Sequence, residues 1–231
     1  MKKLSLYAPI AVTLCGLLGA MLRNMVLSSG PDGKGLYPAG HPCWILLLIL
    51  TAAVLAGIWL LTKFVPSETR SHPPVFTAVG AFAAAVGMAH FGLTQLGSTV
   101  TKIACLAALC GAAAMLLLGV FTLLGKKGPG IFHLFPTFFS ALLMFVFAQS
   151  YSREPELSRF CLQLGALAFS TLAFFQKWGW ETGLKDEKKT RFWTLSALYL
   201  CLIAAPGSYS LLFSGMALYH LLGNIPEENH E

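Results

Sequence analysis

The stretch that decides the fold is CWILLLILTAAVLAGIWLLTKF, residues 43–64. Residues 43–62 contain no charge and no proline, and their few polar side chains are small. A helix needs about 20 apolar residues, at about 1.5 Å each, to cross roughly 30 Å of hydrocarbon. Because the apolar residues are continuous rather than alternating, this run predicts a membrane-spanning helix and not a barrel strand.

Similar runs recur along the whole chain. Of the 231 residues, 56% are hydrophobic and only 11% are charged, whereas soluble domains carry about 25% charged residues. We therefore predict an all-α polytopic transmembrane bundle that forms one domain over residues 1–231, in contact with the lipid bilayer. The expected spans are about 4–27, 43–64, 75–96, 103–125, 131–151, 160–180, 189–205 and 208–224.

The final apolar stretch, residues 192–223, is too long for one crossing. As a single helix it would measure roughly 48 Å. Pro206-Gly207 lies near its middle, where proline removes a backbone donor and the pair is typical of a turn. Ser208 is a suitable N-cap for a new helix. Two short spans, and eight in total, are therefore expected; the alternative is a single kinked seventh helix.

The basic residues predict the orientation. One set of loops and ends carries eleven of the 16 lysines and arginines, and the other set carries Arg23, Lys34, Lys102, Arg153 and Arg159. The positive-inside rule assigns the richer set to the cytoplasm, which places the N-terminus inside. The first apolar run resembles a signal peptide, but no small-x-small cleavage site precedes Arg23, so an uncleaved span in a multi-pass protein of the cell membrane is expected.

The sequence contains none of the usual catalytic motifs. The predicted spans contain no Asp or Glu, which argues against carboxylate-driven pumping and paired-carboxylate hydrolysis. There is no H-E-x-x-H, G-x-S-x-G or phosphate-binding glycine loop. We expect no enzyme activity, no cofactor, no metal and no nucleic-acid partner. The six cysteines are interpreted as small buried hydrophobic residues rather than a disulfide framework.

A few polar residues lie at membrane depth in the outer half. They are Arg23, Asn24, His90, Gln95 and Gln149. One hypothesis is an outward-facing polar cleft in which Arg23 recognises a small polar or anionic solute and the others supply hydrogen bonds. The alternative is that Arg23 reaches the headgroups, the glutamines lie at the interface and His90 makes one interhelical hydrogen bond.

Three further polar residues are given structural roles. His133 and His220 are both expected near the cytoplasmic face, but no third metal ligand is placed with them. Gln163 is expected at the outer start of the sixth span, where headgroup contact is sufficient to explain it. Glycines and alanines recur at four-residue spacing within residues 80–111, for example Gly80, Ala84 and Gly87. This spacing predicts close helix packing at the centre of the bundle.

The connector DGKGLYPAGHP (32–42), the loop YSREPELSRF (151–160) and the interrupted final stretch carry a resemblance. In these features the chain resembles a family of uncharacterised multi-pass bacterial membrane proteins. The resemblance implies a bacterial plasma-membrane protein and transfers no catalytic residue.

Two functions are compatible with these features, and a third class, an intramembrane enzyme acting on lipid or peptide through His90 or His133, is the least expected because the spans contain no carboxylates. The first is a small-solute permease or membrane binding component that uses the polar cleft. The second is a membrane sensor or partner subunit that docks a cytoplasmic protein through the basic 177–191 loop. Lys185, Lys188, Lys189 and Arg191 of that loop could also attract anionic lipid, at about 1 kcal/mol per charge.

Overall fold

The computed structural model of the chain describes residues 2–29, 41–64, 74–95, 99–126, 128–151, 157–184, 186–207 and 209–225. These residues form eight α-helices and one short 3-10 helix, with no strand among them. The elements are α1 (Lys2–Ser28), α2 (Pro42–Phe64), α3 (Pro74–Thr94), α4 (Thr99–Leu123), η1 (Gly130–His133), α5 (Leu134–Tyr151), α6 (Leu157–Glu181), α7 (Glu187–Ala204) and α8 (Ser210–Leu222). Each of the eight predicted spans coincides with one α-helix, to within about a helical turn at either end.

Five of the described helices are long and apolar enough to cross a membrane. These segments are Tyr7–Ser28, Pro42–Phe64, Pro74–Thr94, Thr101–Leu123 and Gly130–Gln149. Many leucines and isoleucines of α1, α2 and α4 are exposed on the outside of the bundle. Apolar surface on this scale fits hydrocarbon and not water, so the chain is a helical protein of the membrane-embedded type. Helix α8 is a shorter apolar helix of 13 residues, about 20 Å long.

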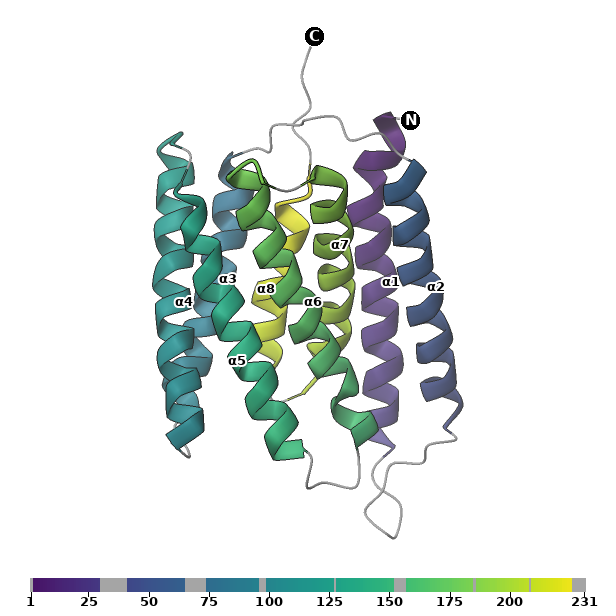
Figure 1. Ribbon diagram of the computed structural model, residues 1–231. Helices are drawn as coiled ribbons and strands as arrows, with labels where there is room; N and C mark the ends of the chain where they lie inside the picture. Colours follow the sequence, from purple (N-terminus) through teal and green to yellow (C-terminus); the bar gives the residue numbers. More distant parts are fainter. Residues whose placement is uncertain are drawn as a thin grey trace.

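Six helices form a closed ring. Contacts run in order from α3 to α4, α5, α6, α7 and α8, and α8 returns to α3. The α1–α2 pair packs outside this ring against α7 (Figure 1). The start of α1 and the end of α8 lie at the same end of the bundle (Figure 1), as eight antiparallel helices require.

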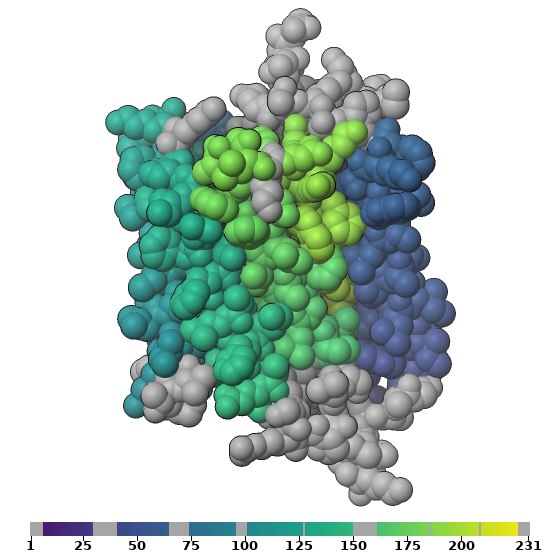
Figure 2. All heavy atoms as spheres, in the orientation of Figure 1, coloured from purple at the N-terminus to yellow at the C-terminus, as the bar shows by residue number. Residues whose placement is uncertain are grey.

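Aromatic side chains fill much of the ring. Phe139 and Phe174 are completely buried. The ring of Phe91 lies 5.6 Å from that of Phe139, and the ring of Phe147 lies 4.9 Å from that of Tyr209, between centroids. Figure 2 shows that side chains also fill the spaces between the ribbons of α4, α5 and α6 on the face in view. The interior is therefore a packed core.

Glycines let α3 and α8 approach each other at backbone distance. A Cβ atom on Gly215 would lie 2.5 Å from the carbonyl oxygen of Ala83, and one on Gly87 would lie 2.8 Å from that of Leu211. Gly80 similarly faces the backbone of Tyr219. The prediction that small residues form the packed centre is confirmed for this helix pair.

The chain breaks between α7 and α8. Asp186 caps the start of α7 by accepting a hydrogen bond from the backbone N–H of Lys188. The helix ends at Ala204, two residues before Pro206, and Gly207 has a φ of +129°, a conformation that favours glycine. The predicted N-cap Ser208 lies outside the described residues; Tyr209 occupies the cap position of α8. The expected two helices are thus present in place of one kinked helix.

The cysteines differ in part from expectation. All six carry free thiols, and Cys105 and Cys201 are buried. However, Cys110 and Cys161 are exposed on the helix surface. The prediction of six buried residues was wrong for these two because a lipid-facing position also accepts a small apolar side chain.

We predict that Gly215→Val destabilises the bundle by about 1–3 kcal/mol or more, because the added side chain must push Ala83 and α3 away. Thermal unfolding in detergent measures the effect. Gly57→Val is the matched control, since a Cβ atom on Gly57 meets nothing within 4 Å. Equal melting temperatures for the two variants would contradict the close α3–α8 contact.

Candidate functional site

Ionisable side chains are buried at both ends of the bundle. His133, Lys177 and His220 lie at the end where α1 begins, and Arg23 lies toward the opposite end. Buried charges and imidazoles are costly in an apolar interior, so they indicate either a specific structural contact or a working site.

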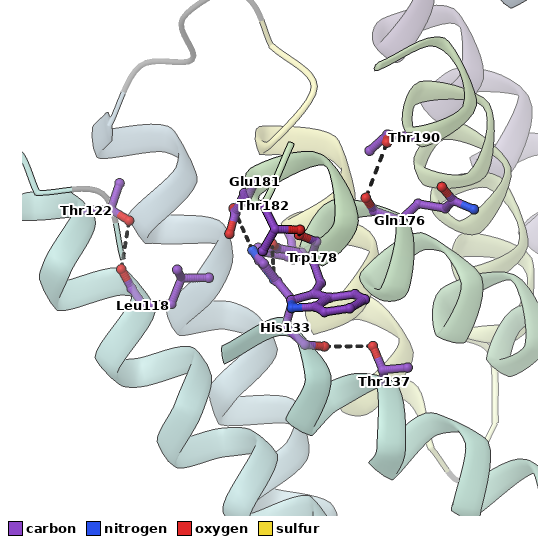
Figure 3. Close-up of polar contacts among 10 residues, drawn as sticks. Leu118, Thr122, His133, Thr137, Gln176, Trp178, Glu181, Thr182 and Thr190 are labelled. Atoms are coloured by element: carbon purple, nitrogen blue, oxygen red, sulfur yellow. Dashed lines mark hydrogen bonds and ion pairs between the residues drawn. The ribbon is translucent and has the colours of Figure 1, made fainter. Parts of the chain in front are cut away.

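We use the name histidine cluster for the five side chains of His133, Lys177, Glu181, Tyr219 and His220. They come from η1, from the last turns of α6 and from the last turn of α8. Figure 3 shows how the contact between His133 and Glu181 joins η1 to the end of α6.

The segment before α5 sets the position of His133. Gly128, Pro129 and Gly130 follow the end of α4 and lead into the 3-10 turn. Pro136 stands in the first turn of α5, where a missing backbone N–H is tolerated. The hydroxyl of Thr137 donates to the carbonyl of His133 at 2.7 Å. The turn is thereby fixed with its imidazole directed into the bundle.

A hydrogen-bonded chain connects the surface to the core. Nε2 of His133 lies 2.8 Å from Oε1 of Glu181, and Nδ1 of His133 lies 3.2 Å from the hydroxyl of Tyr219. Glu181 is 30% exposed, whereas His133 is 1% exposed. Glu181, His133 and Tyr219 can all exchange protons. They therefore form a chain that begins at a solvent-accessible carboxylate and ends in the core.

Lys177 is buried beside this chain, with 8% of its surface exposed. Its Nζ lies 4.1 Å from the centroid of the Tyr219 ring and packs directly against Gly223, which ends α8. A cation is stabilised there by the ring and by the C-terminal end of the helix. Among the described residues, no oxygen accepts a hydrogen bond from this ammonium, although Glu181 interacts with it electrostatically.

His220 is completely buried and its ring nitrogens have no hydrogen-bond partner in the described part of the chain. Its ring packs 5.1 Å from that of Phe174, and Lys177 is a charged neighbour. A neutral imidazole has one donor and one acceptor, and leaving either buried without a partner costs about 1–3 kcal/mol. Together, Lys177 and His220 offer unused polar groups in one buried place.

A polar stripe runs along the inner face of α6. Gln163, Ser170 and Lys177 are spaced seven residues apart, so they share one helix face, and all three are buried. Ser170 contacts the thiol of Cys201 in α7 at 3.2 Å, and Gln163 lies beside Gly207 at the α7–α8 break. From Gln163 to Lys177 the stripe extends about 21 Å.

Arg23 caps the C-terminal end of α7. The guanidinium is 3% exposed, and its Nη1 donates to the carbonyl of Ile203 at 2.8 Å. In a continuous helix that carbonyl would accept from the residue four positions on, but α7 ends at Ala204, before Pro206. A cation at a helix C-terminus also complements the helix dipole. Arg23 therefore faces the bundle and not the headgroups.

The other residues of the predicted outward cleft lie elsewhere. Asn24, His90 and Gln149 are exposed and Gln95 is half-buried. Helix α1 packs on α2 and α7, whereas α3, which carries His90, packs on α4 and α8. The structure thus brings Arg23 together with α7 and places His90 on another side of the bundle. The cleft built from these five residues stays a prediction.

The basic 177–191 loop needs a correction. Helix α6 continues to Glu181 and α7 begins at Glu187, so only a short connection separates them. Lys177 is buried, and Lys188, Lys189 and Arg191 belong to the first turns of α7. The predicted extent of this loop was wrong, because apolar content alone does not show that a helix continues through its last polar turn. The docking of a protein or of anionic lipid by these basic residues stays a prediction. Lys185 lies outside the described residues.

Sequence reasoning missed three members of the histidine cluster. Lys177 was counted as a loop charge, Glu181 lay one residue beyond the predicted span, and Tyr219 was not singled out. The seven-residue spacing of Gln163, Ser170 and Lys177 was an available signal for an inward polar face.

Within the described residues, no group of three His, Cys, Asp or Glu side chains is arranged to hold a metal ion. Comparison with known proteins finds no family model, no curated protein and no solved structure that matches this chain. Function is therefore argued from the site itself.

We predict that Arg23→Met lowers stability by about 1–3 kcal/mol, because it leaves the buried carbonyl of Ile203 without its donor. Thermal unfolding in detergent provides the measurement, with Asn24→Ala, an exposed neighbour, as the control. A wild-type melting temperature for Arg23→Met would show that this contact does not hold the end of α7.

Proposed function

We propose that this chain is a small-solute permease or membrane binding component of the bacterial cell membrane, and that it takes a small anionic solute at the histidine cluster. In this proposal the chain crosses the membrane eight times with its N-terminus in the cytoplasm. The cluster then lies on the cytoplasmic side, at the end of the bundle where α1 begins (Figure 1).

The observation that carries the proposal is the environment of Lys177. Lys177 is a buried residue whose ammonium donates to no oxygen in the described chain, and the unpartnered imidazole of His220 interacts with it electrostatically. An anion with acceptor oxygens would receive a charge-assisted hydrogen bond from the lysine and a second bond from the imidazole. Both desolvation costs would then be recovered in the complex.

The other residues of the histidine cluster favour an anion rather than a cation as the ligand. The carboxyl group of Glu181 already contacts Nε2 of His133, at 2.8 Å. Asn224 and Thr194, at the same end, bond to each other, and neither accepts a hydrogen bond from Lys177. A positive group without a matching acceptor attracts negative charge.

The polar stripe of α6 supports movement rather than binding alone. Gln163 stands near the opposite end of the helix from Lys177, and the Oε1 atom of Gln163 is buried without a hydrogen-bond partner in the described residues. Polar side chains on one inward face of a bundle are typical of solute pathways in membrane proteins. The stripe ends beside the α7–α8 break, where irregular backbone is tolerated because the protein surrounds it.

We predict that anions stabilise the purified protein in neutral detergent. Chloride, nitrate, acetate and sulfate are added as sodium salts at equal ionic strength, and melting temperatures are compared. The best anion should bind about tenfold or more weakly to Lys177→Met than to wild type, because a charged hydrogen bond contributes about 1.5–3 kcal/mol.

Lys189→Met is the matched control, since Lys189 is an exposed lysine in the same region. It should retain the wild-type response. A parallel series with added phosphatidylglycerol separates free anions from lipid headgroups as the source of the charge. Equal responses to all four anions, or an unchanged response in Lys177→Met, would contradict an anion site at this lysine.

A further inference from the structure

We infer that the anion binds together with a proton, which enters through Glu181 and is held on His133. This inference rests on the proposed function, because it names the co-substrate of the same site. The structural basis is the connected chain from Glu181 through His133 to Tyr219, with separations of 2.8 Å and 3.2 Å between the bonded atoms.

The order of exposure along the chain gives the direction of entry. Glu181 is partly exposed, whereas His133 and Tyr219 are both buried. In the neutral tautomer that carries its proton on Nδ1 and donates it to the hydroxyl oxygen of Tyr219, Nε2 is free to accept. A proton from water binds a carboxylate oxygen of Glu181 and passes along the 2.8 Å contact to this Nε2 atom of His133. The carboxylate is regenerated and the imidazole becomes imidazolium. One proton has moved, and no electron has been transferred.

The protonated imidazole fits its surroundings. Both of its ring nitrogens become donors, and each already faces an acceptor: Nε2 faces the carboxylate of Glu181, and Nδ1 faces the hydroxyl oxygen of Tyr219. No rearrangement of side chains is needed to accommodate the added proton. In the neutral state the ring donates from only one of these nitrogens.

The charge count links the proton to the anion. With His133 neutral, the ammonium of Lys177 and the carboxylate of Glu181 cancel, so the histidine cluster carries no net charge. With His133 protonated, the cluster carries one positive charge. In a site of low dielectric constant, this charge strengthens attraction for an anion at Lys177. Release of the anion then favours return of the proton along the same chain.

The other groups around His133 do not alter this count. Glu181 of α6 and Tyr219 of α8 contact His133, and His220 of α8 interacts with it electrostatically. The charge of Lys177 acts on Glu181 and His220. From α4, the ring of Phe121 packs 6.0 Å from that of Phe132, the residue before His133. From α5, the contact is the hydroxyl of Thr137. Apolar or hydroxyl groups therefore cover the sides that α4 and α5 provide.

The test measures affinity for the most stabilising of the four sodium salts as a function of pH, between about pH 5 and about pH 7, within the range in which histidine commonly titrates. For the wild-type protein we expect affinity to fall by up to about tenfold per pH unit at the alkaline end, as coupling to one proton requires. His133→Gln should bind with no pH dependence. His90→Gln, which alters an exposed histidine, should retain the wild-type profile.

Glu181→Gln is the second variant, and it keeps the shape of the side chain while removing the negative charge beside His133. The fall in affinity should begin at lower pH in this variant, because the imidazolium loses its ionic partner. A direct readout is acidification of proteoliposomes that contain a pH-sensitive dye when the same sodium salt is added outside.

The outcomes separate the two proposals. If the wild-type protein binds an anion with no pH dependence, or if His133→Gln keeps the wild-type profile, the proton inference is overturned while the anion site stands. If no anion binds to the wild-type protein, the proposed function fails as well. If His133→Gln does not fold, the proteoliposome readout decides: acidification beyond that of protein-free liposomes supports the proton inference, and its absence overturns it.

Discussion

A helix that ends inside an apolar bundle leaves carbonyl groups that water does not reach, and this constraint governs the centre of the structure. Both α7 and α8 are shorter than α1 or α6, and the chain between them turns at Pro206-Gly207. Their C-terminal ends point to opposite ends of the bundle (Figure 1). Each end is met by a buried cation from a longer neighbour: Arg23 at α7 and Lys177 at α8.

The placement of the helices follows closely from the sequence because it depends on local properties. Span length, the spacing of small residues and the break at Pro206 can all be recognised within one segment. The separate helices α7 and α8 and the close packing of the small residues of α3 were predicted in this way, whereas the partner of α3, helix α8, was not. Both predicted features depend on backbone geometry that a few neighbouring residues determine.

The histidine cluster could not be predicted to the same extent, because its contacts join distant parts of the chain. His133 lies 48 residues from Glu181 and 86 residues from Tyr219 in sequence. Only the ring of helices brings these elements together. Counting Lys177 with the loop charges was reasonable for topology, since lysines flank spans, but its position on the face of Gln163 and Ser170 decides its burial. Arg23 was singled out as a residue of an outward cleft, and the partner that the structure gives it is a carbonyl of α7.

The two cations differ in chemistry in a way that matches their surroundings. A guanidinium is planar and directional, so Arg23 is suited to a fixed bond with the carbonyl of Ile203. An ammonium is a compact charge on a flexible stem and can change partners without a change in the backbone. Lys177 contacts an aromatic face and a helix end, which attract a cation without saturating its three donors. The same helix-end constraint therefore produces a closed contact at one end of the bundle and a group still able to bind a ligand at the other.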